Sequence, residues 1–480
     1  MPDLFSTVGP ALAGLFPAFG RALRCIGRGL KKLARPLLYL LLALLLVHIV
    51  ATIVTGLMLR KELSRIKAAG EALTTRELAP TVPPGQRNAA DLYQQAFQAL
   101  RLSGDDEEIL FPDLDLSDPD RLTLAREVVS ANADYFSLLD EASRIPACAF
   151  PVDWDAGFDM TFPHLAKMRQ AARMLGLRAE VLAAAGDLDA GVASCSSAFR
   201  MAEHAKQEPT LIAQLVSYAI QETVVPALEH ALSKGAPSPQ AARQLFDQLA
   251  AIDQVETFSR SIQGERTFGL YGFSYVRRAP LAKVAWLIHY ETPAPWEVAA
   301  TALYRTVGRP LLNLDQLTYL STWRRYDRAF ALPWPRSTEQ ADAIGWAVDR
   351  LPTYRAVLTK MIFPVYGRAI WRRERLTAQM RAAQISLALK AYHAEHARYP
   401  DSLAELEAAG WRLPTDPFVG EPFHYRRDGD GFVVWSTGQD MDDDGGRPFD
   451  QAAFDAREFA TTEEYEEAEQ DYDLPFRCER

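Results

Sequence analysis

The sequence predicts a mainly α-helical protein with an N-terminal transmembrane helix and a small α+β module near the C-terminus. Three observations predict this class. A long apolar run lies near the N-terminus, apolar residues recur three and four positions apart through most of the chain, and short strand-like segments separated by turn residues follow near the end. A chain of 480 residues is too long for one hydrophobic core, so we expect more than one domain.

The N-terminal run has the length of a membrane-spanning helix. Residues 36–59 contain no Asp, Glu, Lys or Arg. At about 1.5 Å per residue they span the roughly 30 Å hydrocarbon core of a bilayer. A cleaved signal peptide is the alternative, but its apolar core is about 7–15 residues long and ends at a small-residue site. The greater length and the distance from the N-terminus favour an uncleaved single-pass anchor.

The charges that flank the anchor predict its orientation. Residues 1–35 carry six basic residues against Asp3, and residues 60–85, a linker, mix both signs. The positive-inside rule therefore places the N-terminus in the cytoplasm and the bulk of the chain outside it. Apolar residues in the basic stub recur at helical spacing, which favours an amphipathic helix on an anionic membrane surface. A disordered leader is the alternative.

We expect residues 86–370 to form an irregular α-helical domain. Within it, residues 163–208 predict two helices joined at residues 185–187, where Gly186 allows the chain to reverse and Asp187 caps the second helix. This pattern resembles one tetratricopeptide-type helix pair, so the domain is partly tetratricopeptide-like. Small residues would let the two helices approach closely, namely Ala183, Ala184, Ala190 and Ala193. Further helices are predicted at residues 210–232, 238–252 and 338–350.

Residues 267–335 are rich in aromatic and basic residues. Such a composition can mark a binding surface, but it also suits helices that pack in an all-α domain, and we favour packing. If a groove exists there, its candidates are Arg325, Tyr326 and Trp334. Outside this segment no basic patch interleaved with aromatic residues stands out in the middle of the chain, so we expect no nucleic-acid partner.

The C-terminal module is predicted over residues 371–450. A long helix over residues 372–396 precedes a short one that begins with a capping box of Ser402 and Glu405. Two strands follow, at residues 423–427 and 431–437, joined by the hairpin turn sequence "DGDG". Residues 451–480 form an acidic tail, in which "DLPFRC" is a candidate final strand.

This module resembles the globular part of type II secretion major pseudopilins over about 75 of the 480 residues. The matching elements are the long helix ending near "YP", the "DP" loop, the strand "GEPFHY" and the strand "WSTGQD", which leads into an acidic glycine loop. The resemblance implies a structural calcium ion in that loop, held by Asp440 together with Asp442, Asp443 or Asp444. The layout of the whole chain also resembles uncharacterised membrane-anchored bacterial envelope proteins, which implies the inner (cytoplasmic) membrane.

The residues of the loop independently suggest a cation. Asp440, Asp442, Asp444 and Gly445 form D-x-D-x-D-G, the opening of an EF-hand loop, although Gln451 stands where that loop has a bidentate Glu. Carboxylates this close repel one another unless a cation or water shields them, and hard oxygen ligands favour Ca²⁺ over zinc or copper. The candidate metal ligands are therefore Asp440, Asp442, Asp443 and Asp444. A solvated acidic turn is the alternative.

Catalytic motifs are missing from the sequence. It contains no HExxH, no G-x-S-x-G and no phosphate-binding glycine loop, and His393 and His396 lack an evident third ligand. We assign no catalytic residue, and the sequence disfavours an enzymatic role. The three cysteines after the anchor, Cys148, Cys195 and Cys478, are expected to be buried thiols, with one bridge among them as the alternative.

The sequence therefore favours a membrane-anchored extracytoplasmic scaffold or interaction protein of the bacterial envelope, with protein partners. One alternative is an accessory component of a type II secretion or pilus-like system. Another is an exported hydrolase of unknown substrate.

Overall fold

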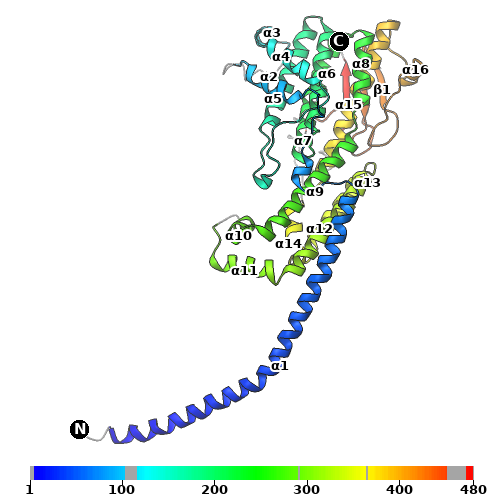
Figure 1. The fold of residues 1–480 in the computed structure, drawn as a ribbon. Coiled ribbons are helices and arrows are strands. Elements are labelled where there is room, and N and C mark those ends of the chain that lie inside the picture. Colours follow the sequence, from blue (N-terminus) through cyan, green and yellow to red (C-terminus); the bar gives the residue numbers. More distant parts are fainter. Residues whose placement is uncertain are drawn as a thin grey trace. The chain divides into compact units, whose positions relative to one another are not determined.

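The computed structural model describes residues 5–102, 116–289, 292–363, 366–450, 454 and 472–478. Among these residues helices dominate, and three short strands near the C-terminus form one antiparallel sheet (Figure 1). The predicted class, mainly helical with a small sheet, is confirmed. By its internal contacts the chain divides into two compact units: the first comprises Met1–Arg65 and Val276–Leu317, and the second comprises Ile66–Tyr275 and Thr318–Arg480.

The first unit contains most of the long helix α1 (Phe5–Ala68). Its stretch Arg35–Ala68 is long and apolar enough to cross a membrane, and none of its most apolar window is buried. The unit also contains α10 (Leu281–His289), α11 (Pro295–Thr306) and the start of α12 (Arg309–Phe330). Asn313 Nδ2 donates a hydrogen bond to Thr55 Oγ1 at 3.2 Å, so α12 packs against α1 at this level.

The second unit is built mainly of helices. Its elements are α2 (Ala89–Ala99), α3 (Pro119–Ala131), α4 (Ala133–Ser143), α5 (Pro163–Ala184), α6 (Leu188–Ala205), α7 (Leu211–Lys234), α8 (Pro239–Ala250), α9 (Gln254–Arg278), α13 (Arg336–Asp349), α14 (Val357–Ile362), α15 (Gly367–His396) and α16 (Leu403–Ala408). Helices α5, α6 and α7 pack against one another. Helix α7 is also long and apolar enough to span a membrane, but 56% of its most apolar window is buried, as in a core helix of a folded domain.

The predicted helix pair is α5 and α6. Gly186 has φ +86° in the connection, and Asp187 Oδ1 accepts a hydrogen bond from the backbone N–H of Ala190, as expected for a cap. Of the four alanines predicted to allow the close approach, Ala184 and Ala193 are exposed, whereas Ala183 is buried and Ala190 is half-buried. Gly191, which the prediction did not include, makes the closest approach: a Cβ there would lie 3.0 Å from the carbonyl oxygen of Ala179.

The last part of the aromatic segment, from Thr318 on, belongs to the second unit. Tyr326 is 1% exposed and lies against Phe330, Phe363 and Tyr366. Arg325 is exposed beside this buried cluster. The favoured interpretation, packing rather than a binding groove, therefore holds for Tyr326.

Helix α15 joins the helices to the sheet. It packs against α7 and α8 and also against β2 (Gly431–Ser436) and β3 (Leu474–Cys478). The central strand β2 is buried throughout and pairs antiparallel with both β1 (His424–Asp428) and β3. The predicted hairpin and the candidate final strand are both present. The predicted start of a separate C-terminal module at residue 371 stays a prediction. The second unit, which contains α15, includes residues on both sides of this position.

The start of α16 differs from the predicted capping box. The Ser402 side chain makes no capping hydrogen bond, and the Glu405 carboxylate accepts from the backbone N–H of Asp401 instead of Ser402. Arg398 and Tyr392 also donate to this carboxylate. These hydrogen bonds lower the pKa of Glu405 to about 2. Glu405, the acid predicted at this position, is thus the shared acceptor of a small hydrogen-bond network that links α16 to the end of α15.

Candidate functional site

A cleft of about 640 Å³ lies in the second unit between the end of α8, the start of α9 and one face of α15. Ligand sites in proteins usually have volumes of about 300–1,000 Å³, so the cleft could hold a small molecule or a few residues of a peptide. Apolar side chains line part of it, namely Leu249, Ile252, Val255, Met380 and Pro414. Charged and polar side chains line the rest, namely Asp253, Gln254, Glu374, Thr377, Arg381, Gln384 and Arg412.

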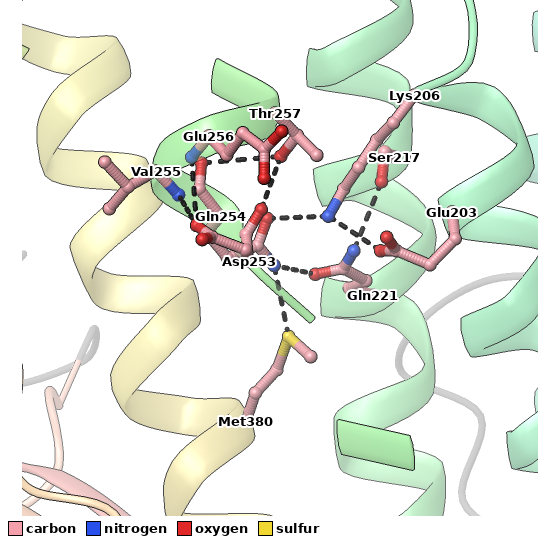
Figure 2. A network of polar contacts seen from close by, with 10 residues as sticks. All are labelled: Glu203, Lys206, Ser217, Gln221, Asp253, Gln254, Val255, Glu256, Thr257 and Met380. Carbon is pink, nitrogen blue, oxygen red and sulfur yellow. Dashed lines mark hydrogen bonds and ion pairs between the residues drawn. The ribbon is translucent and has the colours of Figure 1, made fainter. Parts of the chain in front are cut away.

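Gln254 connects the cleft to a buried polar network, which Figure 2 shows. Its Nε2 donates to Gln221 Oε1 at 2.6 Å and contacts Met380 Sδ at 3.4 Å, while its Oε1 accepts from Lys206 Nζ at 2.9 Å. Gln254 and Lys206 are each 5% exposed. Buried polar groups need such partners because an unsatisfied one costs about 1–3 kcal/mol.

Lys206 is the charged member of this network. Its Nζ lies 2.7 Å from Glu203 Oε1, one helical turn earlier on α6. Burial lowers the pKa of Lys206, while Glu203 opposes that shift. The ammonium is thus held between a carboxylate and the Gln254 carbonyl, which suits a structural clamp between α6 and α9.

Asp253 fixes the direction in which α9 begins. Its Oδ1 accepts hydrogen bonds from the backbone N–H groups of Val255 and Glu256, and its carbonyl oxygen accepts from the Thr257 hydroxyl (Figure 2). An acid that accepts from the first free N–H groups of a helix is a good N-cap. The cap orients Gln254, the next residue, into the buried network.

Two arginines of α15 act on the other side of the site: Arg381 lines the cleft, and Arg373 binds the lining residue Glu374. The buried guanidinium of Arg373 donates to Glu374 Oε1 at 2.5 and 2.9 Å and to the Phe330 carbonyl oxygen at 3.0 Å. Arg381 donates to the carbonyl oxygen of Thr415 at 2.8 Å, which holds the loop after α16 beside the cleft. The lining of the cleft therefore combines carboxylates, guanidinium groups and apolar side chains.

The chemistry of these lining residues suits binding. None of the residues that line the cleft is His, Cys, Ser, Lys or Tyr, and the Thr377 hydroxyl donates to the carbonyl oxygen of Arg373. The acidic side chains among them are the carboxylates of Asp253 and Glu374, both of which accept hydrogen bonds within the protein. Sequence reasoning missed this site because Lys206, Gln221 and Gln254 come from three different helices, and only packing brings them together.

The predicted aspartate loop follows β2 directly. Asp440 and Asp442 are exposed, and Asp440 Oδ1 accepts from the Asp442 N–H. Asp443 is engaged more heavily: its Oδ1 accepts from Trp435 Nε1 at 2.8 Å and from the N–H of Gly445 at 3.0 Å. His424 Nδ1 lies 3.3 Å from the other oxygen of Asp443. The Asp443 carboxylate therefore contacts side chains of both β1 and β2.

Asp444 is the half-buried aspartate of this loop. Asp473, which the sequence-based prediction did not include, contacts the loop from the interior of the protein. Asp473 is fully buried just before β3, and its Oδ2 accepts from the Gly446 N–H at 2.7 Å. Burial raises the pKa of Asp473 to about 6, and the charges of Asp443 and Asp444 add to the shift. Among the described residues, neither Asp444 Oδ2 nor Asp473 Oδ1 has a hydrogen-bond partner.

These two oxygens give partial support to a cation in the loop. Buried acceptors without donors fit a hard cation, whereas the engagement of Asp443 and the 3.1 Å ion pair between Asp444 and Arg447 compete with it. Within the described part of the chain, no group of three or more His, Cys, Asp or Glu side chains is arranged as a metal site. Calcium binding by Asp440, Asp442, Asp443 and Asp444 stays a prediction.

Two other predicted features have structural roles. Trp334 Nε1 donates to the carbonyl oxygen of Gln439 at 3.1 Å, so this residue supports the start of the aspartate loop. His393 stacks on Tyr399 and His396 stacks on Tyr392. Cys148, Cys195 and Cys478 are free and buried, as expected.

In the comparisons with known proteins, no family model, no curated protein and no solved structure matches this chain. The class of this protein therefore comes from its structure alone: it is a mainly helical protein with a small antiparallel sheet and an N-terminal helix apolar enough to span a membrane.

Proposed function

We propose that this chain is a single-pass membrane-anchored scaffold or interaction protein of the bacterial envelope, with its second unit outside the cytoplasm. The observation that carries the proposal is α1, whose charge-free residues 36–59 lie in one helix and are preceded by six basic residues. The most apolar window of this stretch has no buried residue. An exposed apolar helix of this length is costly in water and favourable in lipid.

The cleft supports an interaction role over a catalytic one. It combines apolar, acidic and guanidinium groups, which together suit a peptide or another mixed-polarity ligand. The two carboxylates that line the cleft, Asp253 and Glu374, already accept hydrogen bonds from the α9 backbone and from Arg373, which favours binding over the activation of water. The pseudopilin and tetratricopeptide likenesses, and the secretion-system alternative, stay predictions.

The topology can be tested with cysteine labelling of the full chain in cells. Cys148, Cys195 and Cys478 are buried and should not react in the folded protein. A new cysteine at Trp346, which is 66% exposed on α13, should react with a membrane-impermeant maleimide after the outer membrane is opened. Cys25 precedes the span and should react only after the inner membrane is permeabilised.

Two results would overturn the proposal. One is release of the full chain from membranes by alkaline carbonate, which extracts peripheral proteins. The other is labelling of Cys25 but not of Trp346→Cys in spheroplasts, which would reverse the orientation. A Cys25→Ser variant carrying Trp346→Cys gives the matched control, because it isolates the signal of the new thiol.

A further inference from the structure

Helices α10 and α11 of the first unit expose large apolar side chains. Trp286 on α10 is 52% exposed, and Trp296 and Leu303 on α11 are 68% and 61% exposed. Val307, at the end of α11, is 59% exposed. Clusters of exposed aromatic and aliphatic side chains usually mark an interaction surface.

The exposed residues of α11 share one face of the helix. Positions 296, 303 and 307 are seven and four residues apart, which places their side chains within one stripe. Thr301, which points away from this stripe, is 5% exposed. The apolar stripe of α11 is thus exposed while the one buried residue of the helix is the polar Thr301, which is the reverse of a helix that packs its apolar face inside a water-soluble domain.

Hydrogen bonds join the membrane anchor to the segments that flank α10 and α11. Asn313 donates to Thr55, which lies in the last part of the charge-free run, and a Cβ on Gly56 would lie 3.9 Å from Asn313 Nδ2. Arg277 donates to Asn313 Oδ1 at 3.1 Å, and Arg305 donates to the Ala279 carbonyl oxygen at 2.7 Å. These contacts fix α11 and the segment before α10 to the end of the span near Arg60.

We propose that α10 and α11 lie in the headgroup region of the leaflet that α1 leaves at Arg60, with Trp286 and Trp296 at the boundary between headgroups and acyl chains. The proposal rests on the proposed function, because it requires α1 to span the bilayer. Tryptophan is enriched at that boundary, and helices with one apolar face bind there.

Charge on and next to these helices identifies the kind of lipid. Lys283 on α10 is exposed, and so are Arg278, which ends α9 just before α10, and Arg309, which begins α12 just after α11. Basic residues beside an apolar face attract anionic headgroups. The surface therefore fits a bilayer that contains anionic phospholipid.

Quenching by brominated phospholipids in nanodiscs tests the depth of the two tryptophans. The full chain, one copy per disc, is compared with Trp286→Phe/Trp296→Phe in discs of phosphatidylcholine and phosphatidylglycerol brominated at a shallow acyl position. Emission of the unmodified chain should be quenched, and the double variant should lose most of that quenching. Trp346→Phe is the control, because Trp346 is 66% exposed in the second unit and should contribute none of it.

The outcomes separate this proposal from the proposed function. If the chain inserts into discs but Trp286→Phe/Trp296→Phe keeps the full quenching, the helices do not contact lipid and only this inference fails. If the chain does not insert at all, the anchor itself is wrong. If shielding of the two tryptophans appears only when two copies share a disc, a second copy covers the surface and the lipid proposal is overturned.

Discussion

The Glu229 carboxylate on α7 accepts a hydrogen bond from the backbone N–H of Arg477 on β3 at 2.6 Å. Strand β3 lies at one edge of the sheet and pairs on its other side with β2. An unpaired N–H on an edge strand is a site for pairing with other chains. Glu229 therefore ties the last strand to the helices and protects part of its edge.

This contact predicts a dependence of stability on pH. Burial raises the pKa of Glu229 to about 6, above its ordinary value of 4.5. The folded state then holds the proton more tightly than the unfolded state, so stability should fall as pH rises from about 4.5 to 6 and level off above. Glu229→Gln keeps an acceptor for Arg477 and removes the titration. It should be more stable than the unmodified chain at pH 7.5, by roughly 1–2 kcal/mol.

Urea unfolding of the full chain in detergent, followed by tryptophan fluorescence at pH 4.5 and 7.5, measures this difference. Glu407→Gln, at an exposed position of α16, is the matched control and should leave the difference between the two pH values unchanged. If Glu229→Gln shows the same change with pH as the unmodified chain, another group causes it.

The polar network behind the cleft should contribute strongly to stability. Gln254→Ala leaves Lys206 Nζ and Gln221 Oε1 without their shared partner in a buried site. The cost should be about 1–3 kcal/mol, as for other unsatisfied buried groups. The free energy of unfolding from a urea titration measures it. Gln95→Ala, at an exposed position of α2, is the control and should change stability by less than about 0.5 kcal/mol. Equal losses in the two variants would show that the network adds nothing.

Calcium should stabilise the aspartate loop if the predicted site exists. A cation would satisfy Asp444 Oδ2 and Asp473 Oδ1, which have no hydrogen-bond partner among the described residues. At a calcium concentration about 100 times Kd, the gain would be about 2.7 kcal/mol. Thermal unfolding of the full chain with calcium and with a chelator measures it. The variants Asp444→Asn and Asp473→Asn should lose the difference, and Asp428→Asn on exposed β1 should keep it. A melting temperature that is the same with calcium and with chelator would leave the loop as a solvated acidic turn.

Local patterns predicted the elements well and the contacts between them poorly. The α5–α6 turn was predictable because the backbone turn at Gly186 and the helix cap at Asp187 depend only on residues nearby in the sequence. The hairpin was predictable for the same reason, since its turn residues are adjacent in the sequence. The cleft was not predictable, because Lys206, Gln254 and Met380 meet only after helices far apart in sequence have packed. Asp473 was missed for the same reason. In the sequence it ends an acidic run, whereas in the fold it is buried just before β3, next to Gly446.

Two helical glycines provide a test of packing in the second unit. A Cβ at Gly264 on α9 would lie 1.6 Å from the backbone carbonyl oxygen of Pro209, and backbone atoms cannot move aside as a flexible side chain can. Gly264→Ala should therefore force α9 away from the loop before α7 and cost about 1–3 kcal/mol. At Gly345 on α13 the nearest atom is the Tyr326 hydroxyl oxygen at 3.5 Å, an ordinary contact. Gly345→Ala should stabilise the chain by about 0.5–1 kcal/mol, since alanine favours a helix interior. Urea unfolding of both variants measures the two changes, and a tolerated Gly264→Ala would mean that α9 does not pack this closely on Pro209.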